Sequence, residues 1–385
     1  MSAQKLFFRP WVLIAAGCAV VLAAVEVVIG TGGTGTALSW VGAAAGAVLL
    51  PVVAQLGLLA GSVLFGLRVR HVVVGAMREI GSFKRGEVTF TFRALPVTLR
   101  AQIGPWRYPV ILRCWLAGLL SALAGFALVA GSWLLVSGPL GRGFALAVTG
   151  LMLYKLWPQR VPLTTSTGWL LFSLPRLGEP ERSEFLAAPL AARVYAALRR
   201  GEIDQAAAHA DELSEHYPGL NATMSCQVAV MEARGDYAPG VLTLLKYLSD
   251  NDVPPRKMSY LLVGIAGLGF KAVEADQLPA DTLLPTARKA LHDAVGLGYP
   301  EFELNGTNGL LALLDGDAET AARLAAKGAE YNHSPLSRAD DFVTLARAHM
   351  ARRDNAAARS ALVRAEELAP WSPRVAETRQ RLSVS

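Results

Sequence analysis

The first 180 residues contain no aspartate and one histidine, His71, and their carboxylates are four glutamates. An aspartyl protease mechanism needs aspartate, and a hydrolytic zinc site needs three protein ligands and a carboxylate that takes a proton from the bound water. Glu26 is the only one of these glutamates within a long apolar stretch. A serine mechanism lacks a placed base, because His71 follows an apolar stretch instead of facing Ser121 or Ser132. Residues 1–180 alone therefore exclude these three kinds of catalytic site.

Cysteine and charge are also scarce. The cysteines at 18, 114 and 226 have no paired spacing, which predicts buried apolar side chains instead of disulfides or metal ligands. Only 18% of the residues are charged and 52% are hydrophobic, too apolar for an ordinary soluble protein. Residues 1–180 carry 15 Lys and Arg against four Glu, whereas the other 205 residues carry 22 basic and 27 acidic side chains. This asymmetry predicts a membrane domain, 1–180, and a second domain, 181–385.

Four apolar segments are expected to cross a bilayer, which takes roughly 20 helical residues. Lys and Arg gather near the N-terminus, in 67–108 and after the fourth segment, whereas the loop 31–39 has no charge. The positive-inside rule then places both termini in the cytoplasm of a multi-pass protein of the inner membrane. The basic residues surround apolar spans instead of lining one helix, so no nucleic-acid partner is expected. The four segments are about 10–30, 40–66, 109–137 and 141–157.

A β-hairpin is predicted between the second and third segments, over 67–97. LRVRHVVVG and VTFTFRAL alternate in polarity, with turn residues between them. Val88, Phe90 and Phe92 share one face of the second strand, and we expect the bilayer or the helices to cover that face. A transmembrane or extended peptide could add at an open edge. Proline at Thr91 is expected to weaken such binding without unfolding the helices.

A resemblance to a known family follows from three stretches. A helix, a short G-x-R-V and a hairpin ending in R-x-L-P resemble the site-2 protease type of intramembrane zinc metalloprotease. On this match Ala54 and Leu58 stand where the family has its two histidines, Gln55 replaces the catalytic glutamate, and Thr167 replaces the ligand aspartate. The resemblance implies an active-site scaffold that holds no zinc or other cofactor. The stretches are AQLGLLAG (54–61), LAGLLSALAG (116–125) and KLWPQRVPLTTSTGWLL (155–171).

A repeat runs through 181–385. Similar motifs begin at Gly201 and Gly235, 34 residues apart, and recur in GDAETAARLAAKGAEY (316–331) and RRDNAAARSALVRAEELAPWSP (352–373). Thirty-four is the tetratricopeptide period. The segment resembles degenerate tetratricopeptide repeats, which implies a cytoplasmic α-solenoid of helix-turn-helix units whose concave surface binds a protein. The alternative is a plain helical domain without a ligand groove.

These patterns predict a mainly α protein: a polytopic helical membrane domain with an inserted β-hairpin, followed by the repeat domain. The Ala-, Arg- and Val-rich composition is typical of a bacterial protein. The expected function is non-catalytic binding by a membrane scaffold or pseudoenzyme, with the bilayer and a protein as partners. Two alternatives stay open. One is an active peptidase whose ligands come from elsewhere. The other is a small-solute transporter that uses Glu26, because a carboxylate within a membrane is costly and often marks a proton or ligand site. The second role considered for Glu26 is structural, either near the interface or hydrogen-bonded within the bundle.

Overall fold

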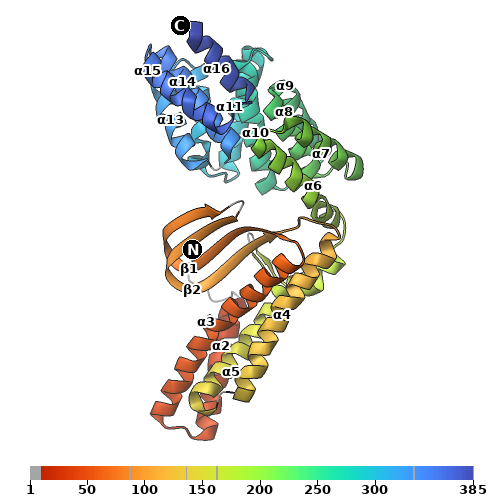
Figure 1. The fold of residues 1–385 in the computed structure, drawn as a ribbon, viewed down its shortest axis with the longest axis vertical. Helices are drawn as coiled ribbons and strands as arrows, with labels where there is room; N and C mark the ends of the chain where they lie inside the picture. The colour runs from red at the N-terminus through yellow and green to blue at the C-terminus, as the bar shows by residue number, and fades with distance from the viewer. Residues whose placement is uncertain (1–9, 86–87, 136, 162–163, 333, 385) are drawn as a thin grey trace. The chain divides into compact units, whose positions relative to one another are not determined.

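A computed structural model describes residues 10–384 except 86–87, 136, 162–163 and 333. The chain divides into two compact units, Met1–Pro189 and Leu190–Ser385. The described part is mainly α-helical with an antiparallel pair of long strands, as the sequence predicts (Figure 1). Helix α6 (Glu181–Arg200) begins at the predicted domain boundary and contributes residues to both units.

Four helices of the first unit form where the apolar segments are predicted. They are α2 (Pro10–Ile29), α3 (Gly33–Leu64), α4 (Val110–Leu135) and α5 (Gly138–Leu156). Within the described residues, α3 and α4 alone are both long and apolar enough to be candidate membrane spans. Two candidate spans therefore replace the four predicted ones. Helix α5 begins with the small and charged run GPLGRG, and within the described part of α2 the stretch Ala19–Ile29 is a shorter apolar helix.

Glycines let α3 approach both of its long neighbours. A Cβ atom added at Gly42 would lie 2.0 Å from the Leu140 carbonyl oxygen of α5. A Cβ atom at Gly61 would lie 2.8 Å from the Ala117 Cα atom of α4. Glycine permits such close contact between helix backbones because it has no Cβ atom. The first half of α3 therefore packs on α5 and the second half on α4, as the bundle in Figure 1 shows.

The predicted hairpin has longer strands than its sequence pattern indicates, and the strands bend so that they pair in more than one place. Strands β1 (Arg68–Arg85) and β2 (Val88–Gly104) are antiparallel, and β2 runs beyond the predicted end at residue 97. Strand β1 turns sharply at Gly75 and Met77, whose φ angles are +101° and +68°. The bend gives residues 71–74 partners on both sides, at 99–102 and at 89–92, while 79–85 pair with 88–93. Each strand thus contributes two segments to a wider sheet.

This arrangement corrects the expectation for Thr91. Thr91 pairs with Val73 on one side and Ser82 on the other, so it lies in the interior of the sheet. It is 5% exposed, and its Oγ1 atom lies 2.8 Å from His71 Nε2. Proline there would break the sheet itself, because interior strands need the backbone donor. The outer segments are 79–85 and 99–104.

The second unit consists of helices joined by tight turns. At the openings of the predicted repeats, Gly201, Gly235 and Gly316 have φ angles of +74°, +84° and +82°. These left-handed conformations end helices at little cost for glycine. Arg353 adopts a φ of +61° at the corresponding turn. The helices are α7 (Ile203–His216), α8 (Asn221–Arg234), α9 (Tyr237–Asp250), α10 (Pro255–Glu274), α11 (Ala280–Gly296), α12 (Asn305–Leu314), α13 (Ala318–Tyr331), α14 (Pro335–Ala351), α15 (Asn355–Leu368) and α16 (Pro373–Val384).

The end of this unit packs back onto its beginning. The indole of Trp371 lies so close to Gly201 that a Cβ atom there would be 2.3 Å from its Cδ1 atom. Pro373, the first residue of α16, lies against Gly235 in the same way, at 3.1 Å. Two repeat openings are thus capped by the segment that leads into α16, and the helical unit is closed by contacts between distant parts of its sequence.

Candidate functional site

Two positions that the family resemblance picks out, Ala54 and Thr167, meet in the first unit through a common partner, Ser121. The Ser121 hydroxyl of α4 donates to the Ala54 carbonyl oxygen of α3 over 2.8 Å, and it lies 3.2 Å from the Thr167 hydroxyl. All three residues are at most 6% exposed. The segment before the short π-helix Trp169–Ser173 therefore joins α3 and α4 at this point. The contacts are hydrogen bonds between hydroxyl and carbonyl groups.

Gln55 and Leu58, the other two positions, have structural contacts. The Gln55 Oε1 atom accepts a hydrogen bond from the Ala101 N–H over 3.3 Å, which ties strand β2 to α3. Leu58 is 6% exposed and belongs to an apolar cluster with Val110, Cys114 and Trp169. An amide and a leucine cannot replace a carboxylate base and an imidazole ligand in zinc hydrolysis.

Hydrogen bonds join Ser121 to Ala54 and Thr167. No group of three or more His, Cys, Asp or Glu side chains that could hold a metal ion occurs within the described residues. Within the described residues Ser121 hydrogen-bonds to the Ala54 carbonyl oxygen and the Thr167 hydroxyl, which are neither imidazole nor carboxylate groups. The geometry serves to hold three segments together.

Glu26 is 2% exposed and is held by three side chains. Its carboxylate accepts a hydrogen bond from the Ser39 hydroxyl over 2.7 Å and from the Thr31 hydroxyl. Arg142 of α5 forms an ion pair with it over 3.2 Å. Of the two roles considered for Glu26, these contacts support a hydrogen-bonded structural group within the bundle. The sequence contained the signal for Arg142, the one basic residue in the turn before the fourth apolar segment.

The three hairpin residues lie on an aromatic face. Phe83 of β1 stacks on Phe90 and Phe92 of β2, with ring centroids 5.1 Å and 5.9 Å apart. Val88 and Phe90 are half-buried and Phe92 is 42% exposed. Within the described residues this face is only partly covered, and the polar Thr91 between the two phenylalanines is the buried side chain. Aromatic side chains also continue onto the outer segment 79–85, through Phe83.

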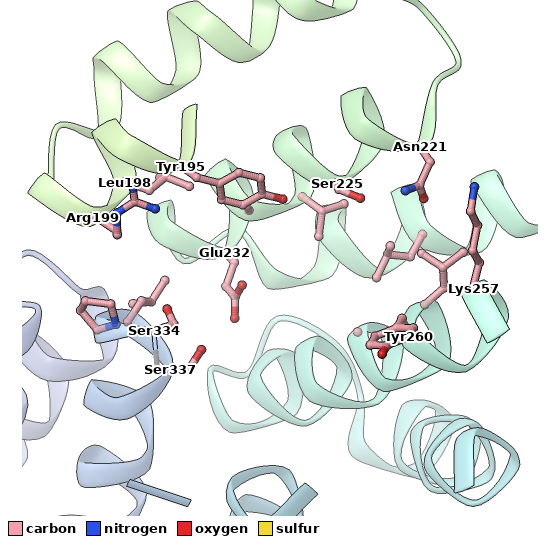
Figure 2. Close-up of a pocket in the computed structure, with 17 residues that line it drawn as sticks. Tyr195, Leu198, Arg199, Asn221, Ser225, Glu232, Lys257, Tyr260, Ser334 and Ser337 are labelled. Carbon is pink, nitrogen blue, oxygen red and sulfur yellow. The ribbon is translucent and has the colours of Figure 1, made fainter. Parts of the chain in front are cut away.

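A groove of about 750 Å³ lies in the second unit (Figure 2). Five helices line it: α6, α8, α9, α10 and the start of α14. Figure 2 shows Glu232 of α8 directed toward the middle of the groove, with Ser337 of α14 on one side and Tyr260 of α10 on the other. Its labelled polar lining residues are Tyr195, Arg199, Asn221, Ser225, Glu232, Lys257, Tyr260, Ser334 and Ser337.

A smaller recess of about 280 Å³ shares part of this lining. Val228, Glu232, Gly264 and Ser337 border both spaces, so the recess adjoins the groove. Its other charged residues come from α10, the short helical turn Glu301–Leu304 before α12, α14 and α16. We call it the acidic recess, because four carboxylates and two cations line it: Glu232, Glu303, Asp340, Asp341, Lys271 and Arg374.

A buried ion network forms one wall of the acidic recess. Lys271 pairs with Glu232 over 2.7 Å and also with Asp340. Arg374, which is 2% exposed, pairs with Asp340 over 3.1 Å and with Glu274 over 2.8 Å. Burial opposes ionisation of Asp340, but Lys271 and Arg374 outweigh it and hold the pKa of that carboxyl below its ordinary value. This wall is therefore charged and internally compensated.

None of these groove and network residues was identified from the sequence. The ion pairs join side chains of helices that are far apart in the sequence, so no local sequence pattern indicates them. One signal was present: Glu274, Asp340 and Arg374 each lie beside residues of an apolar helix face, where a charge needs a partner.

Comparison with known proteins gives no assignment. A scan against protein-family models finds no match, and a search of curated proteins finds no relative.

Proposed function

We propose that the protein is a non-catalytic binding protein anchored in a membrane, which holds a segment of a protein partner in the groove of its helical unit. The groove carries this proposal. It is about 750 Å³ in volume, it combines apolar, tyrosine and charged side chains, and five helices supply its lining. Pockets of this size with a few polar groups between apolar residues are the usual places for specific binding.

The anchor is proposed to be the helical part of the first unit. The two candidate spans, α3 and α4, support membrane association. We extend this to α2 and α5 because both pack on α3 and because Glu26 of α2 is neutralised by Arg142 of α5. The bundle is proposed to be a multi-pass element of a bacterial inner membrane with both termini in the cytoplasm.

Topology tests this part. Lys and Arg are concentrated in 67–108 and are absent from 31–39, so the first should face the cytoplasm and the second the opposite side. Reporter fusions at positions 35, 85, 139 and 300 should report outside, inside, outside and inside. An external signal at 85 or 300 would contradict the proposed orientation.

The core of the bundle is proposed to be a site-2-protease-like scaffold without its chemistry. The meeting of Ala54, Ser121 and Thr167 supports the alignment of the three stretches, and hydroxyl and carbonyl groups occupy the place of ligands. The aromatic face around Phe83 and the outer segment 79–85 are proposed to receive an extended peptide, in place of the edge expected at Thr91.

Site-specific photocrosslinking tests binding in the groove. A photoreactive residue at Ser225, which lines the groove, should form an adduct with a protein in intact cells. The same residue at Asp211, exposed on α7 and outside the groove, is the control. Filling the groove by Ala229→Trp, at a small residue of its lining, should remove the Ser225 adduct. Equal adducts at both positions, or a Ser225 adduct unaffected by Ala229→Trp, would contradict the proposal.

A further inference from the structure

The charges that line the acidic recess are not balanced. Lys271 and Arg374, its two cations, are engaged by Glu232, Asp340 and Glu274. Glu303 and Asp341, the other two carboxylates, form no ion pair with any residue that the structure describes. The Glu303 side chain is exposed, so water can solvate its charge, and it hydrogen-bonds to the Tyr299 hydroxyl. Asp341 is 5% exposed, so solvent does little for its charge.

Asp341 has unused capacity to accept hydrogen bonds. Its Oδ2 atom accepts one from Asn332 Nδ2 over 2.6 Å. Its Oδ1 atom lies against Gly306, where an added Cβ atom would be only 2.0 Å away, and within the described chain it accepts no hydrogen bond. Two glycines, Gly306 and Gly328, make the room in which this carboxylate lies. An ionised carboxylate has about four acceptor positions, so most of those on Asp341 are unfilled.

The charged groups that line the recess together with Asp341 come from five elements. Asp340 is beside it on α14, Lys271 faces it from α10, Arg374 from α16, Glu232 from α8, and Glu303 from the turn before α12. Burial raises the pKa of Asp341 to about 7, and Lys271 and Arg374 only partly counter this effect. A buried carboxylate in this position takes up either a proton or an external cation.

We propose that the acidic recess binds an arginine or lysine side chain of the protein segment that occupies the groove, with Asp341 as its carboxylate partner. This inference rests on the proposed function. The recess adjoins the groove, so one extended segment can lie in the groove and insert one side chain. A metal ion is disfavoured, because no group of three ligands that could hold one is present in the described part of the chain. A guanidinium group suits the site best, since it is weakly hydrated and can donate to both carboxylate oxygens.

A basic side chain that belongs to a bound protein segment is a better ligand for the recess than a free amine. A free cation would gain one partly compensated ion pair and would lose its own hydration. A side chain attached to a segment that already contacts the groove enters the recess at a high effective concentration. The proposal therefore commits to a protein segment, and free arginine is one arm of the test.

The experiment selects peptides on the full-length protein in detergent micelles. A library of short random displayed peptides is panned against the wild type, Asp341→Asn and the control Asp211→Asn. The wild type and Asp211→Asn should enrich peptides with Arg or Lys at one fixed position. Asp341→Asn should lose the preference at that position and keep the others. The asparagine has the same shape and can still accept from Asn332, and circular dichroism verifies that the variant is folded.

A selected peptide then measures the effect. Replacing its arginine by the uncharged isostere citrulline should weaken binding to the wild type at least tenfold and leave binding to Asp341→Asn unchanged. Binding of the arginine peptide to the wild type should weaken about tenfold from pH 8 to pH 6, because only the ionised fraction of Asp341 is competent. The citrulline peptide should show no such dependence.

Any other outcome of these experiments contradicts a specific part of the proposal. Arg or Lys preference that persists in Asp341→Asn overturns the role of Asp341. Enriched peptides without a basic position overturn the recess proposal and leave the groove proposal intact. Free arginine that competes at the concentration of the peptide overturns delivery by a segment. If neither the wild type nor Asp211→Asn enriches any peptide, the proposed function itself fails, and this inference fails with it.

Discussion

Three carboxylates that lie almost completely out of solvent are stabilised in different ways. Glu26 is 2% exposed and has an arginine and two hydroxyl groups. Asp340 is 7% exposed and has a lysine and an arginine. Asp341 is 5% exposed and has one amide. A buried charge is stable only if its partners offset the loss of hydration. Glu26 and Asp340 are therefore compensated structural charges, whereas Asp341 is not. Asp341 is thus the residue at which stability and binding should conflict.

Replacing Asp341 by asparagine should stabilise the protein, and the gain should depend on pH. Asp341 has a pKa of about 7 in the folded state, above its value in the unfolded chain. Stability from this group is therefore complete below about pH 4 and is lost as the pH rises toward 7. Asp341→Asn removes the loss, so its advantage over the wild type should grow from near zero at pH 4 to roughly 2–4 kcal/mol at pH 8. Thermal melts of both proteins at several pH values measure this difference, and a difference that is independent of pH would contradict it.

At the scale of elements, the sequence predicts the helices of the first unit well because their apolar runs are local. The length of the sheet was missed. VTLRAQIG alternates in the way a strand does, but the pairing of 71–74 on two sides depends on the bend at Gly75, which no periodicity reveals. Fewer helices have the length and composition of a membrane span than the sequence predicts, and α5 differs because it opens with a small and charged run.

Some features of the candidate sites could also be predicted from local sequence, and others could not. The aligned stretches brought Ala54 and Thr167 to one place, but their common partner Ser121 was not recognised, because a hydrogen bond between residues 46 or more positions apart has no local pattern. The left-handed turns at Gly201, Gly235 and Gly316 are visible in the sequence as repeated glycines. The groove and the acidic recess are not, because they arise only when α8, α10 and α14 are stacked.

At the scale of the whole molecule, the second unit is held closed by charge as well as by apolar contacts. Arg374 of α16 connects Glu274 of α10 with Asp340 of α14, and Trp371 covers the turn at Gly201. Arg347 of α14 also pairs with Glu274 over 2.8 Å. Stacked repeats usually contact only their neighbours. Here the final helix links elements that are separated by many helices, so the unit should unfold as one body.

Removing the Arg374 side chain should therefore destabilise the whole helical unit. Arg374→Ala leaves Glu274 and Asp340 buried with fewer cations, which typically costs about 3–5 kcal/mol. The matched control is Arg379→Ala on the same helix, whose exposed pair with Glu366 should contribute at most about 1 kcal/mol. Denaturant unfolding followed by circular dichroism compares them. Similar losses for the two variants, or loss of α16 alone while the earlier helices stay folded, would argue against closure by Arg374.

The closure has a consequence for biosynthesis. Glu274 and Arg374 are 100 positions apart, so Glu274 leaves the ribosome long before its partner. During that interval α10 carries charged side chains that cannot be buried, and the helical unit must wait in a partly open form while α3 and α4 are already available for insertion. Translation therefore orders two events: α3 and α4 leave the ribosome first, and the charge network of the helical unit is completed only when α16 emerges. A nascent chain stalled before Pro373 would lack the arginine partner of Glu274 and Asp340, and its open helices would be substrates for chaperones and proteases.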